Sequence, residues 1–303
     1  MKFTFNKQFM VLMFLLLNCF ASYAANEDLI TKQITLKLTE AGTLPNKIAS
    51  SKKNLVTNLK IIGEINGTDL RFIREMAGSD IDGNSTSGNL SVLDLSEARF
   101  VEGGVSYYYY DGYCHTSNDI IGEHAFSGCS SLTSVNIPSS VAYIGDCAFQ
   151  DCSSLTSINI PSSVTEIREY AFDGCSSLIS VKIPSSVTSI GGSAFSGCSG
   201  LRSIYVYAET VPSTVAGAFE GCDSKNCTVY VPKGTYDAYW LSEWGYFDNI
   251  VEFDATNIRN IVAEPEVQEN ARYAVNGQRL TAPVKGINLV KYNNGRVKKE
   301  IVK

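Results

Sequence analysis

The residues best suited to chemistry in this chain are its nine cysteines and two histidines. Equivalent side chains of stacked strands point in parallel, so cysteines at equivalent positions are expected to be buried packing thiols rather than a disulfide framework. No histidine recurs with the same period as these cysteines, which argues against a repeated zinc site. The sequence leaves the pairing of Cys114, Cys147 and Cys227 open. The other five mature cysteines recur every 23 or 24 residues: Cys129, Cys152, Cys175, Cys198 and Cys222.

The remaining candidates for catalysis or metal binding are isolated. His115 follows Cys114, but a nucleophile and its base normally meet in space rather than in sequence. His124 occupies a variable repeat position, which predicts exposure. Residues 80–84, DIDGN, resemble a calcium loop, but the glycine comes too early and no glutamate closes it, so we expect a polar turn. We therefore expect no enzyme, no catalytic residue, no cofactor and no metal site.

The cysteines lie in a sequence repeat that occurs several times in the chain. Residues 125–141 read AFSGCSSLTSVNIPSSV, and similar copies begin at Ala148, Ala171 and Ala194. A fixed period of this length predicts stacked coils, none of which buries its apolar face alone. In each coil a Leu-x-x-Val-x-Ile segment alternates like a strand, and the following proline ends it. Such strands stack into a parallel sheet on one face of a solenoid.

The repeating unit L-x-x-[VI]-x-I-P-S-S-V-x-x-I-x-x-x-A-F-x-x-C-S-S resembles the 23-residue leucine-rich repeat of BspA-like bacterial surface proteins. Residues 61–78, 90–104 and 227–253 are similar to the flanking segments of that family. The resemblance implies a β-rich leucine-rich-repeat solenoid with short helical N- and C-terminal caps. Thr68 and Thr235 are the expected helix N-caps. Trp240 and Trp244 form either a lid over the last coil or a sugar-binding platform.

The chain is expected to have four parts. Residues 1–24 have the pattern of a signal peptide, with Lys2 and Lys7 before an apolar run and a cleavage site after Ala24. Cys19 leaves lipid attachment open as an alternative. The solenoid with its caps follows over residues 25–253, with regular repeats at about 120–232. Residues 254–271 are expected to be a linker before a small β C-terminal segment at 272–303.

The C-terminal segment carries turn signals at Asn276-Gly277 and at residues 293–295. It resembles the C-terminal sorting regions of Gram-negative bacteria that use the type IX secretion route. A degenerate remnant of such a region, or a small sheet that packs on the solenoid, is the alternative. These features together predict an exported protein, secreted or at the cell surface of a Gram-negative bacterium.

Charge and hydropathy limit the partners. The chain has 25 Lys and Arg against 31 Asp and Glu, a net charge of −6. Without Lys2 and Lys7, 23 basic residues remain against 31 acidic ones, a balance of −8. An acidic protein gains nothing from phosphate backbones, so we expect no nucleic acid partner. No second apolar stretch approaches spanning length, so we expect no transmembrane span in the mature chain.

The positions that vary between copies lie on the outward face of the sheet. A neighbouring column is small and featureless, consisting of Val92, several serines and Thr228. Aromatic side chains on an exposed concave sheet suit a protein ligand, while simple cross-strand pairing of Tyr205 with Tyr230 is the structural alternative. The variable positions form what we call the outer column: Asp94, Asn136, Asn159, Lys182, Tyr205 and Tyr230.

An insertion interrupts the repeat before Leu132. The interval from Leu90 is 42 residues where one period is 23, and it contains GGVSYYYYDGYC at residues 103–114. Its tyrosines either contribute to binding or fold back to shield the sheet. We expect a non-enzymatic protein that acts in adhesion or protein-ligand binding, with host extracellular matrix proteins implied by the resemblance. A structural role with envelope proteins is the alternative. The candidate tyrosines are Tyr107, Tyr108, Tyr109 and Tyr110.

Overall fold

The computed structural model of the protein describes residues 29–254, 269–274, 278–280, 282–292 and 297–302. The expected signal peptide with Cys19, most of the expected linker and both predicted C-terminal turns lie outside the described residues. The chain divides into two compact units, one ending at Phe253 and the other beginning at Asp254.

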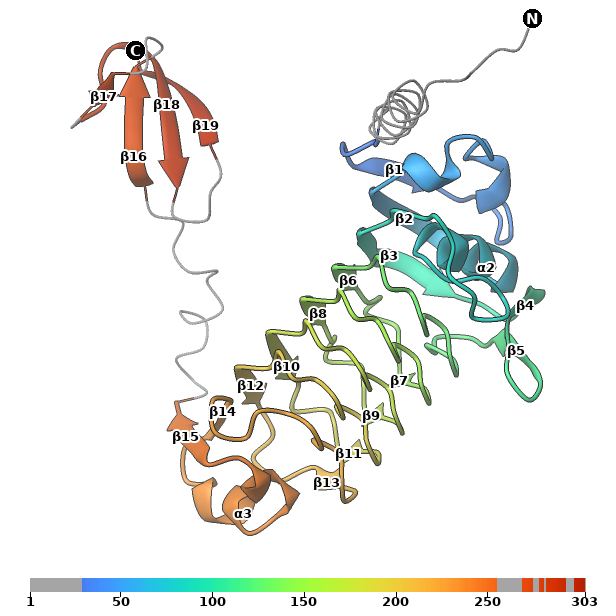
Figure 1. The fold of residues 1–303 in the computed structure, drawn as a ribbon, viewed down its shortest axis with the longest axis vertical. Helices are drawn as coiled ribbons and strands as arrows, with labels where there is room; N and C mark the ends of the chain where they lie inside the picture. The colour runs from blue at the N-terminus through green and yellow to red at the C-terminus, as the bar shows by residue number, and fades with distance from the viewer. Residues whose placement is uncertain (1–28, 255–268, 275–277, 281, 293–296, 303) are drawn as a thin grey trace, which may run out of the picture. The chain divides into compact units, whose positions relative to one another are not determined.

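The first unit is a solenoid of parallel strands (Figure 1). Its large sheet has the strand order β1-β2-β3-β6-β8-β10-β12-β14-β15, and each neighbouring pair is parallel. The predicted parallel sheet of a leucine-rich-repeat solenoid is thus confirmed. The strands are β1 (Ile34–Lys37), β2 (Asn58–Ile65), β3 (Val92–Phe100), β6 (Ser134–Asn136), β8 (Ser157–Asn159), β10 (Ser180–Ile183), β12 (Ser203–Val206), β14 (Thr228–Pro232) and β15 (Asn249–Phe253).

A second parallel sheet, which the repeat pattern did not predict, lies on another side of the coils (Figure 1). In a typical coil Pro161 follows the first strand, and Val164 and Ile167 are then buried. The chain therefore turns a corner after the proline and adds a short second strand before the Ala-Phe pair. The four strands, in the order β13-β11-β9-β7, are β7 (Tyr143–Ile144), β9 (Glu166–Ile167), β11 (Ser189–Ile190) and β13 (Ser213–Thr214).

The phenylalanines of successive coils stack in the interior of the solenoid. Neighbouring ring centroids lie 5.1, 5.3, 5.1 and 5.8 Å apart, and the ring planes differ by no more than 11°. Trp244 and Phe247 contact the last ring of this stack at 4.7 and 5.2 Å. Each coil thus gives the next an apolar surface of the same shape, which explains why the residue type repeats. The stacked residues are Phe126, Phe149, Phe172, Phe195 and Phe219.

The five recurring cysteines, which we call the cysteine ladder, are unpaired and buried, as predicted. They also make a contact that the sequence did not indicate. From the second coil onward each thiol donates a hydrogen bond to the phenylalanine carbonyl of the preceding coil, for example Cys175 Sγ to Phe149 O at 3.2 Å. Cysteine is therefore both a small core residue and a weak donor that adds a second hydrogen bond to a carbonyl already bonded within its own coil. The same contact joins Cys152 to Phe126, Cys198 to Phe172 and Cys222 to Phe195.

Two positions of each coil have a left-handed backbone. The position before the Ala-Phe pair has φ between 54° and 55° in four coils, where it holds His124, Cys147, Tyr170 and Ser193. The position before the ladder cysteine is glycine in most coils but Asp151, with φ of 57°, in one. L-residues adopt this conformation at a cost, so these sites tighten the turn at the expense of local strain.

The helix α2 (Gly67–Met76) precedes the regular coils. Its N-cap is Asn66, not Thr68 as predicted: the Asn66 side chain accepts from the Thr68 amide at 3.0 Å, and Asp69 completes a capping box. Thr68 instead uses its hydroxyl oxygen to accept from the Val105 amide at 3.1 Å. Two short 3₁₀ helices, η1 (Leu44–Asn46) and η2 (Lys53–Leu55), come before α2 in the chain.

Two short helices follow the last repeat, α3 (Tyr236–Trp240) and η3 (Glu243–Tyr246). Thr235 occupies the N-cap position of α3, but its side chain makes no capping hydrogen bond. The carboxylate of Glu252 accepts from the Gly234 and Tyr236 amides instead, at 2.8 and 3.0 Å. The two tryptophans differ, because Trp244 is fully buried on the phenylalanine stack while Trp240 is 45% exposed.

The insertion forms an antiparallel hairpin of β4 (Gly103–Tyr109) and β5 (Tyr113–Thr116), which we call the tyrosine hairpin. Strand β4 packs against α2, and Gly67 permits this approach because a Cβ there would overlap the Val105 carbonyl oxygen. Figure 1 shows the hairpin beside α2 and away from β10, β12 and β14. Of the two alternatives for the insertion, the one in which it folds back over the large sheet is therefore wrong.

The second unit contains a four-stranded antiparallel sheet in the order β17-β16-β18-β19. Its strand β16 begins at Glu269, so the segment expected to be a linker up to residue 271 overlaps this strand. Asn288 is buried and its side-chain amide donates to the Val284 carbonyl at 2.6 Å. The strands are β16 (Glu269–Ala274), β17 (Arg279–Leu280), β18 (Gly286–Tyr292) and β19 (Val297–Val302).

Candidate binding surfaces

The outer column runs across the large sheet, with its members at equivalent positions of neighbouring strands. Strand pairing aligns Asp94 with Asn136 and Asn136 with Asn159. Further along the sheet it aligns Lys182 with Tyr205 and Tyr205 with Tyr230. The adjacent small column is aligned in the same way, from Val92 through the serines to Thr228. The sheet thus brings side chains from six coils into one row.

At the N-terminal end of this row, the charge and hydrogen-bonding groups of Asp94 already have partners within the protein. Asp94 pairs with Lys60 of the neighbouring strand at 3.3 Å, and Lys60 also pairs with Glu97 at 2.7 Å. Asp94 accepts from the Ser96 amide as well, at 3.0 Å. Burial opposes ionisation of Asp94, but these contacts outweigh it and lower its pKa. A group with this many internal partners has little capacity left for a ligand.

The C-terminal end is different because its side chains are large and face solvent. Tyr205 and Tyr230 stack with ring centroids 4.6 Å apart and planes 8° from parallel. Both rings are half-buried, and Lys182 beside them is exposed. Among the described residues no carboxylate forms an ion pair with Lys182. The cross-strand pairing considered as an alternative is thus present, and it holds two aromatic faces in a fixed position.

The four consecutive tyrosines of the insertion have different environments. Tyr107 is 1% exposed, and its hydroxyl donates to the Glu123 carbonyl at 2.7 Å. Tyr108 is half-buried with its ring 4.4 Å from the guanidinium of Arg74. Tyr109 and Tyr110 are 48% and 64% exposed. Tyr107 is therefore inaccessible to a ligand, although Val105 and Tyr109, two positions away on either side along β4, are exposed.

His124 is buried, with 4% of its surface exposed, so the prediction of an exposed site is wrong. The rings of Tyr108 and Tyr110 each lie 4.9 Å from the imidazole. Its backbone carbonyl accepts from the guanidinium of Arg74 at 2.7 Å. Burial and the nearby charge of Arg74 lower the pKa of His124. The cover comes from the tyrosine hairpin, a segment that the other coils lack.

The Cys114–His115 pair has no arrangement for nucleophilic catalysis. Successive residues of β5 point to opposite faces, and Cys114 is half-buried while His115 is exposed. Burial and the charge of Glu123 raise the pKa of Cys114, which disfavours the thiolate that such chemistry requires. Cys114, Cys147 and Cys227 are all unpaired. Burial, with nearby carboxylates, raises the pKa of Cys147 to about 11.

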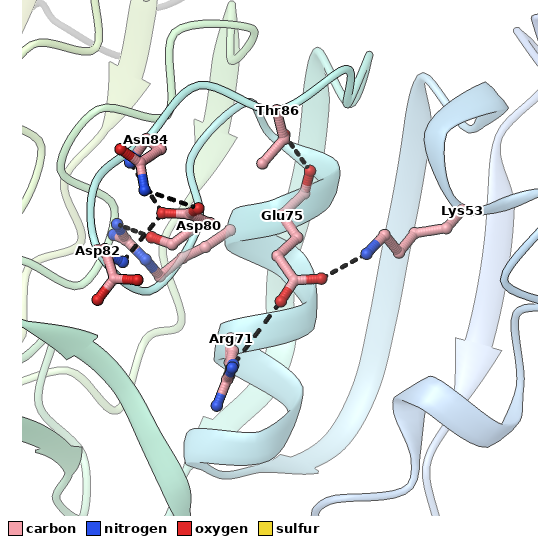
Figure 2. Close-up of polar contacts among 8 residues, drawn as sticks. Lys53, Arg71, Glu75, Asp80, Asp82, Asn84 and Thr86 are labelled. Atoms are coloured by element: carbon pink, nitrogen blue, oxygen red, sulfur yellow. Dashed lines mark hydrogen bonds and ion pairs between the residues drawn. The ribbon is translucent and has the colours of Figure 1, made fainter.

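Residues 80–84 form the predicted polar turn. The Asp80 carboxylate accepts from the Asp82 and Asn84 amides at 2.9 and 2.8 Å (Figure 2). Burial opposes ionisation, but these hydrogen bonds prevail and lower the pKa of Asp80. Figure 2 also shows Glu75 of α2 in ion pairs with Lys53 and Arg71. In the part of the chain that the structure describes, no group of three His, Cys, Asp or Glu side chains is placed to hold a metal ion.

A comparison with known families identifies the repeat. Residues 115–235 match the model of the BspA type leucine rich repeat region in six copies. We call these matched residues the BspA-type region, after the repeat family that they are similar to. The BspA-type region contains the phenylalanine stack, the cysteine ladder and most of the outer column, which agrees with the resemblance drawn from the repeating unit. The comparison with curated proteins gave no significant match.

Three solved structures are similar to part of the chain. A leucine rich repeat protein of T. pallidum is 29% identical over 48% of this chain and 69% of its own, with a TM-score of 0.38. A leucine rich cell surface protein of Faecalibacterium prausnitzii A2-165 is 33% identical over 45% of this chain and 30% of its own, with a TM-score of 0.31. The pneumococcal vaccine antigen PcpA is 14% identical over 73% and 68%, with a TM-score of 0.35. Among the described residues, no helix has the length and apolar character needed to cross a membrane.

Proposed function

We propose that the protein is a non-enzymatic binding protein that holds a protein ligand on the outer face of the large sheet, at its C-terminal coils. The observation that carries this proposal is the stacked pair of Tyr205 and Tyr230 beside the exposed Lys182. Interface energy is usually concentrated in a few aromatic anchors, and rings that are already ordered lose little entropy on binding. Asn136 and Asn159 extend this surface along the same column.

The BspA-type region supports a role at the bacterial surface. Leucine-rich-repeat proteins bind proteins, and those of the BspA type are typically bacterial surface proteins. We infer adhesion as the role, with host extracellular matrix proteins as the ligand. Export through the signal peptide at residues 1–24, and sorting through the segment at 272–303, would bring the protein to the surface of a Gram-negative bacterium or release it.

We also infer that helical segments cap the solenoid at both ends. The open ends of a repeat stack expose apolar surface that must be covered. At one end α2 packs beside the first coils, with Leu70, Ile73 and Met76 buried. At the other end Trp244 and Phe247 cover the ring of Phe219. Trp244 thus has the position expected of a lid over the last coil, whereas the exposed Trp240 is not part of that lid.

Binding to a panel of purified matrix proteins tests this function. The change from Tyr205→Ala together with Tyr230→Ala is expected to lower affinity for the bound matrix protein by about 2 kcal/mol or more. Both side chains lie on the outside, so the melting temperature is expected to stay close to that of the wild type. The control is Tyr170→Ala with Tyr236→Ala, two exposed tyrosines that do not belong to the outer column.

Undiminished affinity in a folded double variant would show that the ligand binds elsewhere. A protein that binds no matrix component but captures a defined envelope protein through the same tyrosines would replace adhesion with a role in envelope assembly.

A further inference from the structure

A cleft of about 550 Å³ is lined by residues of the tyrosine hairpin and of the second parallel sheet of the solenoid. That sheet lies on a different side of the coils from the large sheet, which carries the outer column (Figure 1). We call this cleft the tyrosine cleft. Its aromatic walls include Tyr110 and Tyr113 from the hairpin and Tyr143 from β7. Tyr110 and Tyr113 are 64% and 67% exposed, which is unusual for side chains with so much apolar surface. The hairpin that supplies them comes just before the first regular coil, and the regular coils have no counterpart of it among the described residues.

The charged groups of the tyrosine cleft are mostly acidic. Asp111, Glu123 and Asp146 line it, and within the described residues none of the three pairs with a lysine or arginine. The side chain of Glu123 is 58% exposed, and its carboxylate lies 3.7 Å from the His124 imidazole. Since the pKa of His124 is lowered, that imidazole is neutral at pH 7 and leaves the Glu123 charge uncompensated.

The thiol of Cys147 adjoins Asp146, one of the acidic residues of the cleft. Burial raises its pKa most, and the carboxylates of Asp146 and Glu123 raise it further, to about 11 in total. A cation that enters the cleft therefore meets both negative charge and the electron-rich faces of tyrosine rings. These are the two features that attract an ammonium or guanidinium group to an aromatic cage.

The protein already contains a guanidinium on one wall of this cleft. Arg168 lies over the ring of Tyr143 with 3.9 Å between its central carbon and the ring centroid. Its Nε donates to Glu166 at 3.2 Å, so the charge of Arg168 is balanced by Glu166 and not by the acidic residues that line the cleft. The arrangement shows that a planar cation fits against a tyrosine face in this cleft. Among the described residues no Lys or Arg lies over Tyr110 or Tyr113, whose ring contacts are with His124 at 4.9 Å and with Tyr109 at 5.0 Å.

We propose that the tyrosine cleft binds an arginine side chain of a protein partner, stacked on Tyr110 and Tyr113 and paired with Glu123. Arginine suits the site better than lysine because its planar guanidinium stacks on aromatic rings and forms directed hydrogen bonds to carboxylates. The cleft is separate from the outer column, so it provides a second contact point whether or not Tyr205 and Tyr230 bind a ligand.

Fluorescence anisotropy of the purified protein with labelled peptides tests the proposal. The probe is a peptide of alternating glycine and arginine, and its control is the same peptide with citrulline, which keeps the shape but removes the charge. We expect the arginine peptide to bind about tenfold more tightly or better. Tyr113→Ala is expected to weaken binding about fivefold, whereas Tyr113→Phe keeps the aromatic face and binds within about twofold of wild type.

Glu123→Gln has a matched control, because a general attraction of cations to an acidic protein must be separated from this site. Glu243→Gln removes the same charge from an exposed position at the far end of the solenoid. We expect Glu123→Gln to weaken the arginine peptide about threefold or more, and Glu243→Gln to leave it unchanged. Circular dichroism establishes that each variant is folded.

Three outcomes would overturn the proposal. They are equal affinity for the arginine and citrulline peptides, full affinity in a folded Tyr113→Ala variant, and equal weakening by Glu123→Gln and Glu243→Gln. The last outcome would reduce the effect to the net charge of the protein.

Discussion

The regular coils and the N-terminal region with its tyrosine hairpin are held together by different kinds of contact. In the coils each residue type packs on its own copy, as the stack from Phe126 to Phe219 illustrates. In the N-terminal region single residues make contacts that occur once, such as Arg74 and Tyr107 with the backbone at residues 123–125. A coil therefore tolerates variation on its surface, whereas the junction depends on individual side chains.

Phe172→Ala is expected to have the largest effect, because it opens a cavity between two stacked rings. Its neighbours at 5.3 and 5.1 Å both lose a partner, and the expected cost is about 3–5 kcal/mol of unfolding free energy. Urea denaturation followed by tryptophan fluorescence measures it. Phe172→Leu is the matched control and is expected to cost less, because it leaves a smaller cavity. A loss below about 1 kcal/mol in the alanine variant would mean that the stack contributes little.

Arg74→Met tests the junction between α2 and the first coil. The guanidinium is fully buried and donates to the carbonyls of His124, Ala125 and Asp80 and to the hydroxyl of Ser79. Removing these donors leaves buried acceptors unsatisfied, at an expected cost of about 2–4 kcal/mol. Hydrogen exchange is expected to rise first at residues 122–126.

The control for this change is Arg71→Met, one turn earlier on the same helix. Arg71 is 40% exposed and pairs with Glu75 at 3.7 Å, so its loss is expected to cost less than about 1 kcal/mol. Similar costs for the two variants would contradict a special role for Arg74.

The stability of the wild type is expected to decrease as the pH falls from about 7 to 5. Burial and Arg74 lower the pKa of His124, while Asp146 acts weakly in the opposite direction. His124 of the unfolded chain therefore takes up a proton near pH 6.5, whereas in the folded protein it does so only at lower pH. Stability is lost below pH 6.5, and the total loss is about 1.4 kcal/mol for each unit by which the two pKa values differ. His124→Asn tolerates the left-handed backbone without titrating, and it should abolish this part of the pH dependence. The same slope in both proteins would assign the effect to another group.

Asp151→Gly is expected to stabilise the protein slightly. Relief of the left-handed backbone gains about 1–2 kcal/mol and the greater freedom of glycine in the unfolded chain costs about 0.5–1, which leaves about 0.5–1 kcal/mol. Burial and Asp173 raise the pKa of Asp151, so the wild type is further destabilised above that pKa. The gain should therefore be larger at pH 7 than at pH 3 in thermal unfolding. A destabilised variant would indicate that the Asp151 side chain makes a useful contact.

Much of the coil was predictable because the same pattern of residue types recurs in each repeat. The fixed period indicated a parallel sheet, the odd number of aligned cysteines indicated unpaired thiols, and alternation placed Lys182, Tyr205 and Tyr230 in one outward row. Each of these inferences needs only local geometry and the assumption that equal sequences adopt equal structures. The second sheet was missed because two-residue strands have too few positions for alternation to be recognised.

The predictions failed where distant segments meet. His124 was expected to be exposed because its repeat position varies, but the hairpin at residues 103–116 covers it, and no other coil has such a segment. Thr68 has the right residue type for an N-cap, yet it bonds to Val105 of the hairpin while Asn66 caps the helix. Residue type alone does not say which of two nearby side chains a helix will use.

The sequence by itself determined the coil: its period, its buried phenylalanines and cysteines, and the row of side chains on the outer face. Those properties follow from hydrophobic periodicity and from the requirement that each coil fit the next. Only the tertiary structure decided that Tyr107 is buried while Tyr110 is open, that Arg74 joins α2 to the first coil, and that Tyr113 and Tyr143 share a cleft. These contacts join segments far apart in the chain, and they depend on packing angles that no local pattern encodes.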